Sequence, residues 1–208
     1  MKYEVSLKDL RQAGACYSGY NKLVRSIQGK PFTDEDDSRK SYIHHAHKEP
    51  VPIISILETN GLDDAIWALR CVKNADRDIR LFGVWCARQV QHLMEDQRSC
   101  DALDVAERFA NGKASAEALA AAWHAACDAA WHAAGDAARD AAWHAARAAA
   151  QAAACDAACD AAQAAAWAAA RAAGAAAWAA ARDAQAEMLK RMCQGKAEWQ
   201  TVKALVTH

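Results

Sequence analysis

Two pairs of closely spaced carboxylates are the side chains of this sequence best suited to acid–base chemistry. Asp63 and Asp64 are adjacent, Asp76 and Asp78 are two residues apart, and His92 could act as a base in the same part of the chain. General acid–base catalysis needs such groups within hydrogen-bond reach of one substrate. Acidic residues are equally typical of helix N-termini, where they face the positive end of the helix dipole. We favour this second interpretation and predict that the chain is not an enzyme.

The sequence also lacks the motifs that mark the common catalytic and metal sites. It has no phosphate-binding P-loop, no G-x-S-x-G nucleophile elbow and no H-E-x-x-H zinc motif. Cys155 and Cys159 are one helical turn apart, and His44, His45 and His47 cluster in a charged stretch, but neither group is joined by further ligands at a fixed spacing. We therefore expect no metal and no cofactor, and we expect the eight cysteines to be reduced.

The charge balance and the beginning of the sequence limit the classes of partner. The 25 Lys and Arg residues are matched by 26 Asp and Glu residues, and no basic cluster stands out, which argues against binding to a nucleic acid polymer. The first ten residues, MKYEVSLKDL, lack the apolar stretch of a signal peptide. The alanine-rich segment further along contains too many Arg, Asp and His residues to cross a bilayer. These features predict a cytoplasmic protein without a membrane partner.

An alanine-rich segment from about residue 114 to residue 186 is the main architectural signal. It repeats the tetrapeptide Ala-Ala-x-x, and alanine has the highest helix propensity of all residues. A strict four-residue period drifts around a helix by about 40° per unit, so no straight seam can hold it along one long rod. We therefore expect shorter helices that fold back on one another, with breaks near Gly135, Gly174 or both.

The sequence before this segment predicts a series of short helices. The signals are apolar residues at spacings of three and four, capping residues at helix starts and glycines at helix ends. They place helices after Ser6 and over residues 17–28, 52–59, 62–72, 76–94 and 98–111. Ser115 is predicted to cap the first alanine-rich helix. No alternating strand pattern of useful length appears. The predicted class is all-α: a bundle of short N-terminal helices with a folded-back, alanine-rich helical C-terminal part. We divide it into residues 1–112 with a flexible loop near 30–51, residues 113–194, and a tail at 195–208.

Three segments of the middle helices resemble an immunity-protein family of bacteria and phages. They are NGLDDAIWALR, DRDIRLFGVWCARQVQHLM and ALDVAERFANG, at residues 60–70, 76–94 and 102–112, and an Ala-rich tail with Trp, Arg and Asp follows them. The similarity extends over about residues 57–186. Because the family is named for its association with polymorphic toxin systems, the resemblance implies a non-catalytic protein that neutralises a toxin or defence effector by direct binding.

Two other functions stay open, and all three need a binding surface. The chain could be a phage counter-defence protein that sequesters a small signalling nucleotide between Trp and Arg side chains, or a structural protein that forms homo-oligomers through its alanine faces. The tryptophans of the alanine-rich segment are typical of helix packing, but an exposed aromatic ladder would grip a partner. The candidate partner-binding residues are Asp64, Arg80, Trp85 and Arg88 in the middle helices and Trp123, Trp131 and Trp143 in the alanine-rich segment.

Overall fold

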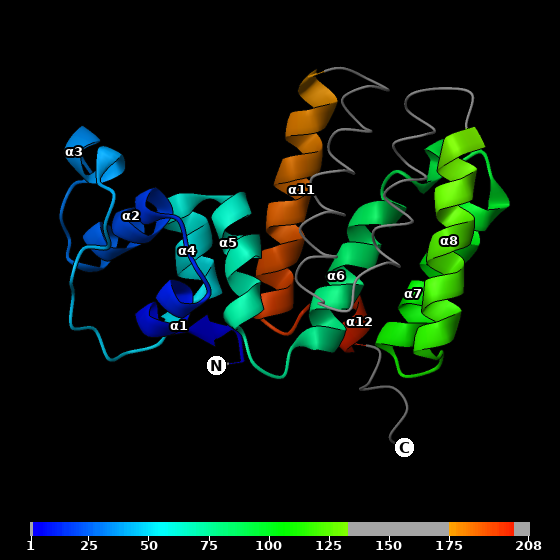
Figure 1. Ribbon diagram of the computed structural model, residues 1–208, viewed down its shortest axis with the longest axis horizontal. Coiled ribbons are helices and arrows are strands. Elements are labelled where there is room, and N and C mark those ends of the chain that lie inside the picture. The colour runs from blue at the N-terminus through cyan, green and yellow to red at the C-terminus, as the bar shows by residue number, and fades with distance from the viewer. Residues whose placement is uncertain (1, 133–174, 202–208) are drawn as a thin grey trace. The chain divides into compact units, whose positions relative to one another are not determined.

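The computed structural model describes residues 2–132 and 175–201, and the chain divides into two compact units, Met1–Ala75 and Asp76–His208. Both units are built mostly of helices, which confirms the predicted fold class (Figure 1). The boundary between the units comes before the expected boundary at residue 112. The reason is that the helices between residues 76 and 110 pack with the helices that follow them.

The first unit contains five α-helices, one 3₁₀ turn and two very short strands. The elements are β1 (Glu4–Val5), α1 (Leu7–Gln12), α2 (Tyr17–Ile27), α3 (Asp34–Ser38), β2 (Val51–Pro52), α4 (Ile53–Asn60), α5 (Leu62–Ala68) and the 3₁₀ turn Leu69–Cys71. Helix α2 packs against α3 and α4, and α4 packs against α5. Their contact buries apolar side chains of α2, α4 and α5, including Tyr20, Val24, Ile53 and Ile66, while α3 buries Asp36.

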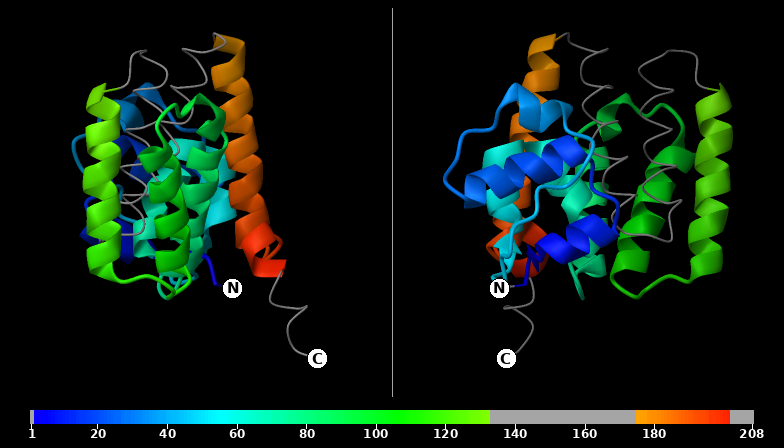
Figure 2. Two further views of the ribbon diagram at one scale, coloured as in Figure 1. Left: turned by 90° about the vertical axis from the view of Figure 1, so that its right-hand side faces the viewer. Right: turned by 60° about the vertical axis from the view of Figure 1, so that its left-hand side comes forward.

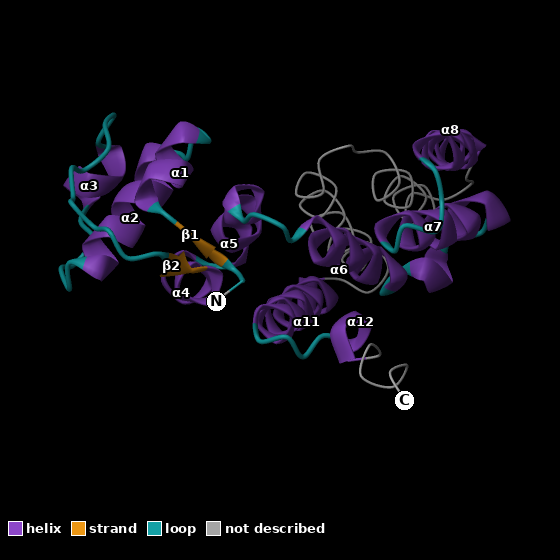
Figure 3. Ribbon diagram, turned by 90° about the horizontal axis from the view of Figure 1, so that it is seen from below, coloured by secondary structure: helices purple, strands orange, loops and turns teal. Residues whose placement is uncertain are grey.

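Two strands of two residues each accompany the helices of the first unit, and both are too short to alter the predicted all-α class. Strands β1 and β2 pair antiparallel, with Glu4 opposite Pro52 and Val5 opposite Val51 (Figure 3). The backbone N–H of Ile53 also donates to the carbonyl of Tyr3 at 3.0 Å. Strands of two residues leave no alternating pattern in the sequence, so only the folded structure reveals this pairing.

The stretch near residues 30–51, which we expected to be a flexible loop, contains α3 and is anchored to α2. Asn21 of α2 is fully buried, and its amide donates to the carbonyl of Ser41 at 3.1 Å and accepts from the N–H of Ile43 at 2.8 Å. Burial of polar groups is tolerated when they are hydrogen-bonded in this way. The three histidines at positions 44, 45 and 47 lie in irregular backbone beyond this anchor, with the rings of His45 and His47 stacked.

An ion pair inside the first unit makes its stability depend on pH. The Arg25 guanidinium forms hydrogen bonds of 2.7 and 2.9 Å with the Asp36 carboxylate and lowers the pKa of Asp36 from 3.8 to about 2, against the opposing effect of burial. Since the folded-state pKa lies below the unfolded value, the pair stabilises the unit fully above about pH 4 and is lost between about pH 4 and pH 2.

We expect Asp36→Asn to remove this component of the acid sensitivity. Urea unfolding of the full chain at several pH values from 5 to 2 would measure it, with Asp34→Asn on the exposed side of α3 as a matched control. The stability of the Asp36→Asn variant should change less between pH 4 and pH 2 than that of the wild type or of the control. An identical acid loss in all three proteins would contradict the assignment.

In the second unit the described residues form helices joined by short turns and loops. Its elements are α6 (Asp76–Arg88), the 3₁₀ turn Gln91–Leu93, α7 (Gln97–Ala110), α8 (Ala116–His132), α11 (Ala175–Cys193) and α12 (Glu198–Thr201). Helix α7 packs between α6 and α8, and runs antiparallel to α8 (Figure 2), while α11 and α12 pack against α6. The core between them contains Phe82, Cys86, Leu103, Leu189 and Met192. No described helix has the length and hydropathy needed to span a membrane.

Helix α6 ends earlier than residue 94, where the apolar periodicity placed its end. The backbone N–H groups of Gln89 and Val90 donate to the carbonyls three residues earlier in the chain, those of Cys86 and Ala87. The side-chain amide of Gln89 instead donates to the carbonyl of Trp85 at 3.2 Å. Hydrogen bonds to the residue three positions back, in place of four, tighten the last turn of α6. The chain then forms a short 3₁₀ turn before α7.

The described ends of the alanine-rich segment are two separate helices. Ser115 caps α8 as predicted, since its hydroxyl accepts from the N–H of Ala118 at 3.2 Å. Helix α8 packs on α7, whereas α11 packs on α6, as expected for a folded-back segment rather than one straight rod. The predicted breaks at Gly135 and Gly174, like the Cys155 and Cys159 pair, lie outside the described residues.

Candidate functional site

The structure brings together only some of the candidate partner-binding residues. Arg80, Trp85 and Arg88 share helix α6, and Trp123 and Trp131 lie on α8 in the same unit. Trp131 is 75% exposed, whereas Trp123 is partly buried beside His124, with ring centroids 4.5 Å apart. Asp64 belongs to the first unit, and Trp143 lies outside the described residues.

Asp64 is engaged in contacts within the first unit. The side-chain amide of Asn60 donates to the Asp64 carboxylate at 2.7 Å and to the carbonyl of Gly19 at 2.7 Å. The carboxylate lies so close to α2 that a Cβ atom at Gly19 would be only 2.5 Å from Asp64 Oδ2. The partly buried Asp64 therefore joins α5 to the first turn of α2, a role that its position in the sequence did not indicate.

We expect Gly19→Ala to destabilise the chain by about 1 to 2 kcal/mol, because the added methyl group must displace the Asp64 carboxylate. At an unconstrained helix position the same substitution would stabilise by about 0.5 to 1 kcal/mol. Urea unfolding of Gly19→Ala, Asp64→Ala and the double variant measures the interaction between the two sites. The double variant should be more stable than the sum of the single effects predicts; simple additivity would contradict the close contact.

Arg88 links α6 to α7 through two acidic side chains. Its Nη2 atom lies 2.8 Å from Asp104 Oδ1 and 2.6 Å from Glu107 Oε2, and its Nη1 atom donates to Gln91 Oε1 at 3.0 Å. Burial opposes the charge of the guanidinium, but the hydrogen bonds to Asp104 and Glu107 outweigh it and raise the pKa of Arg88 above its ordinary value. Arg88 is thus a fixed cation surrounded by carboxylates.

Arg80 has a different environment although it shares the helix. Its guanidinium lies over the ring of Phe109 on α7, 5.1 Å from the ring centroid, and burial lowers the pKa of the group. This cation–π contact joins α6 to α7. Arg80 therefore supports the packing of the two helices, whereas Arg88 and Trp85 border a hollow on the surface.

A small pocket opens between α6, α7 and α12. Its volume is about 250 Å³, and it is lined by Leu81, Val84, Trp85, Arg88, Glu107, Glu198 and Trp199. Apolar and aromatic side chains contribute four of these residues, and Arg88, Glu107 and Glu198 add charge. We call this hollow the α6–α12 pocket. Both tryptophans are half-buried and line the pocket, and the Nε1 atom of Trp199 is buried.

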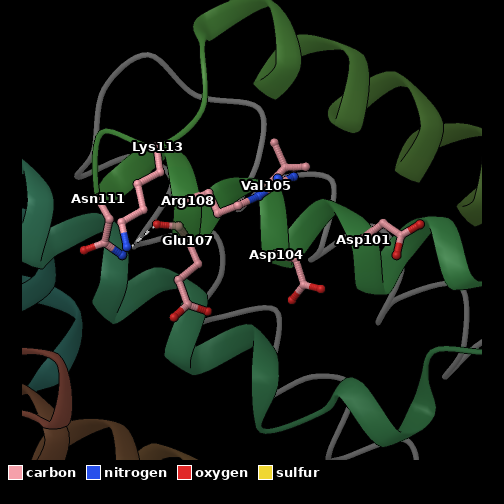
Figure 4. Close-up of a pocket in the computed structure, with 7 residues that line it drawn as sticks. All are labelled: Asp101, Asp104, Val105, Glu107, Arg108, Asn111 and Lys113. Atoms are coloured by element: carbon pink, nitrogen blue, oxygen red, sulfur yellow. Dashed lines mark hydrogen bonds between the residues drawn. The ribbon is translucent and has the colours of Figure 1, made fainter.

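A larger, open hollow lies along α7 next to the α6–α12 pocket. It has a volume of about 660 Å³ and is lined by Asp101, Asp104, Val105, Glu107, Arg108, Asn111 and Lys113. Asp104 and Glu107 extend from the same side of α7, and Asn111 and Lys113 lie at one end (Figure 4). Glu107 lines both hollows. The α6–α12 pocket and this hollow together form one continuous surface, which we call the α6–α7–α12 surface.

The sequence did not indicate Asp104, Glu107 or Trp199, and it missed Trp199 because residues 195–208 gave only the signal of a tail. Helix α12 is held in place by Arg77, whose guanidinium donates to the Asn111 side chain at 2.8 and 3.0 Å and to the carbonyl of Trp199 at 3.3 Å. Gln200 adds bonds to Asp78 at 3.3 Å and to the carbonyl of Met192 at 3.1 Å. Two of these contacts, Arg77 to Trp199 and Gln200 to Asp78, join residues 122 positions apart, and they hold α12 where Trp199 lines the same pocket as Trp85.

Among residues 2–132 and 175–201, no three potential metal ligands of the His, Cys, Asp and Glu types lie close enough to hold an ion. Comparison of the chain with protein-family models, with curated proteins and with solved structures finds no match. The function is therefore inferred from the mostly helical fold and from the aromatic-lined, charged surface formed by α6, α7 and α12.

Proposed function

We propose that this protein is a non-catalytic binding protein that neutralises a toxin or defence effector by direct contact through the α6–α7–α12 surface. The observation that carries the proposal is the α6–α12 pocket, where two half-buried tryptophans and two aliphatic side chains are bordered by Arg88 and two carboxylates. Protein interfaces have this anatomy, with an aromatic centre and a polar rim, and Trp and Arg are enriched among the residues that dominate binding.

The resemblance to immunity proteins supports the same surface. Two of the three segments that carry it, residues 76–94 and 102–112, include all of α6 and the last nine of the 14 residues of α7. These helices supply Trp85, Arg88 and Glu107, and the motif residues thus include the side chains that line the pocket. We therefore place the binding site for the partner on the surface that these two segments form.

The surroundings of the acidic pairs support binding rather than catalysis. The buried Asp78 pairs with Arg77 at 3.0 Å and accepts from Gln200 at 3.3 Å, and Asp64 accepts from Asn60. Each of these carboxylates has a structural role in its own unit, like those of helix-terminal acids. The proposed protein therefore acts as a stoichiometric ligand of its target.

The experiment begins with the native full-length chain purified from the cells that produce it. A co-purifying protein is identified by mass spectrometry, produced alone to test whether it arrests growth, and then produced together with the chain. We expect growth arrest by the partner and its relief by the chain in a 1:1 complex. A bound nucleotide released by heat denaturation, homo-oligomers alone, or a partner whose toxicity the chain leaves unchanged would each contradict the proposal.

A further inference from the structure

The α6–α12 pocket has the size of one side chain. Its volume of about 250 Å³ lies below the roughly 300–1,000 Å³ typical of sites for drug-sized ligands. Leu81 and Val84 contribute aliphatic side chains to its lining, and Trp85 and Trp199 contribute two indole side chains. An occupant must therefore combine an apolar stem with a group that tolerates contact with aromatic rings.

The charge at the pocket is negative. Glu107 and Glu198 line it together with one cation, Arg88. That cation is already held by Glu107 at 2.6 Å and by the neighbouring Asp104 at 2.8 Å, so one guanidinium is shared between two carboxylates. Glu198 is exposed on α12 and adds a further negative charge to this group. Charge complementarity requires a cationic occupant and disfavours an anionic one.

We propose that the α6–α12 pocket receives an arginine side chain of the protein partner. A guanidinium is planar and weakly hydrated, stacks on tryptophan and pairs with carboxylates, and its methylene stem packs on aliphatic side chains. Glu198 is the carboxylate placed to pair with it, and Trp85 and Trp199 are the rings placed to contact it. The inference rests on the proposed function for the source of the arginine, a protein, but the chemistry of the pocket is testable without that protein.

The test uses the full ¹⁵N-labelled chain and a blocked single residue, N-acetyl-arginine methylamide, as the probe. The indole N–H signals of Trp85 and Trp199 are assigned from the Trp85→Phe and Trp199→Phe variants. We expect saturable shifts of these two signals on titration with the arginine probe. Blocked citrulline, which has nearly the same shape without the charge, should produce no saturable shift.

Variants locate the effect at the pocket. Glu198→Gln should weaken binding of the arginine probe about five- to tenfold, through the loss of a charge-assisted hydrogen bond. Glu187→Gln, which changes an exposed carboxylate on α11 of the same unit, should leave the binding curve unchanged. Both positions are exposed, so neither substitution disturbs the core.

Three results would overturn the inference: no saturable shift with blocked arginine, equal shifts with blocked citrulline, or equal weakening by Glu187→Gln and Glu198→Gln. A failure of the arginine assignment can be distinguished from a failure of the proposed neutralising function. If the chain relieves a toxin's growth arrest but does not bind blocked arginine, only the arginine assignment is wrong. If blocked arginine binds but no toxic partner exists, the pocket chemistry stands and the neutralising role is wrong.

Discussion

Trp85→Ala is expected to weaken binding of the protein partner by about 30-fold or more, and to abolish relief of growth arrest at equal protein levels. The indole of Trp85 is half-buried at the margin of the α6–α12 pocket, so its removal takes away aromatic surface that the partner would cover. Isothermal titration calorimetry with the purified partner measures the affinity, and circular dichroism confirms that the helices remain.

Trp178→Ala is the matched control for this prediction. Trp178 lies on α11 of the same unit, is 41% exposed and contacts Arg182, but does not line the α6–α12 pocket. The control should bind the partner like the wild type. If both tryptophan variants lose affinity equally, or if neither does, the partner binds elsewhere and the assignment of the α6–α7–α12 surface is wrong.

Arg77→Ala is expected to destabilise the second unit by about 2 to 3 kcal/mol. The guanidinium bridges α6 to Asn111 after α7 and to the carbonyl of Trp199 in α12, and it pairs with the buried Asp78. Its removal takes charge-assisted hydrogen bonds from three parts of the unit at once. Urea unfolding measures the loss, and hydrogen exchange should show that residues 198–201 lose protection first.

Arg77→Lys separates the charge of this residue from its shape. Lysine keeps the positive charge beside Asp78 but cannot reproduce the forked contacts with Asn111 and Trp199. The variant should therefore recover only part of the stability. Full recovery with lysine, or unchanged exchange at residues 198–201 in the alanine variant, would contradict the account of how α12 is held.

The local signals in the sequence were sufficient to place most of the helices. The predicted helix over residues 17–28 corresponds to α2, and that over residues 98–111 corresponds to α7, each within one residue of its observed ends. The caps at Ser6 and Ser115 are also confirmed. Side-chain periodicity and capping act within a few residues along the chain, so one sequence contains the information to predict them.

The features that depend on distant contacts were not predictable in the same way. The pairing of β1 with β2 joins segments nearly 50 residues apart, and the anchoring of Trp199 depends on Arg77 across more than 100 residues. The contact of Asp64 with Gly19 likewise depends on how α5 meets α2. The spacing of residues along the sequence does not predict these long-range contacts, because tertiary packing determines them.

In the candidate site, too, residues with a local sequence signal were predicted, and residues that depend on long-range contacts were not. The sequence indicated Trp85 and Arg88 because they are a large aromatic and a cation on a clearly amphipathic helix. It did not indicate Asp104, Glu107 or Trp199, which complete the surface only when α7 and α12 pack beside α6. Arg80 was grouped with Arg88 on the sequence, but its contact with Phe109 gives it a packing role.

The most direct test of neutralisation by binding is a titration of the purified partner's toxic activity with the purified chain. A stoichiometric binding protein predicts a linear loss of activity that is complete at one equivalent of chain, with the Trp85→Ala variant shifted to a large excess. Complete loss of activity at a small fraction of one equivalent would indicate turnover, and unchanged activity at several equivalents would show that the chain does not neutralise this partner. Either result would contradict the account.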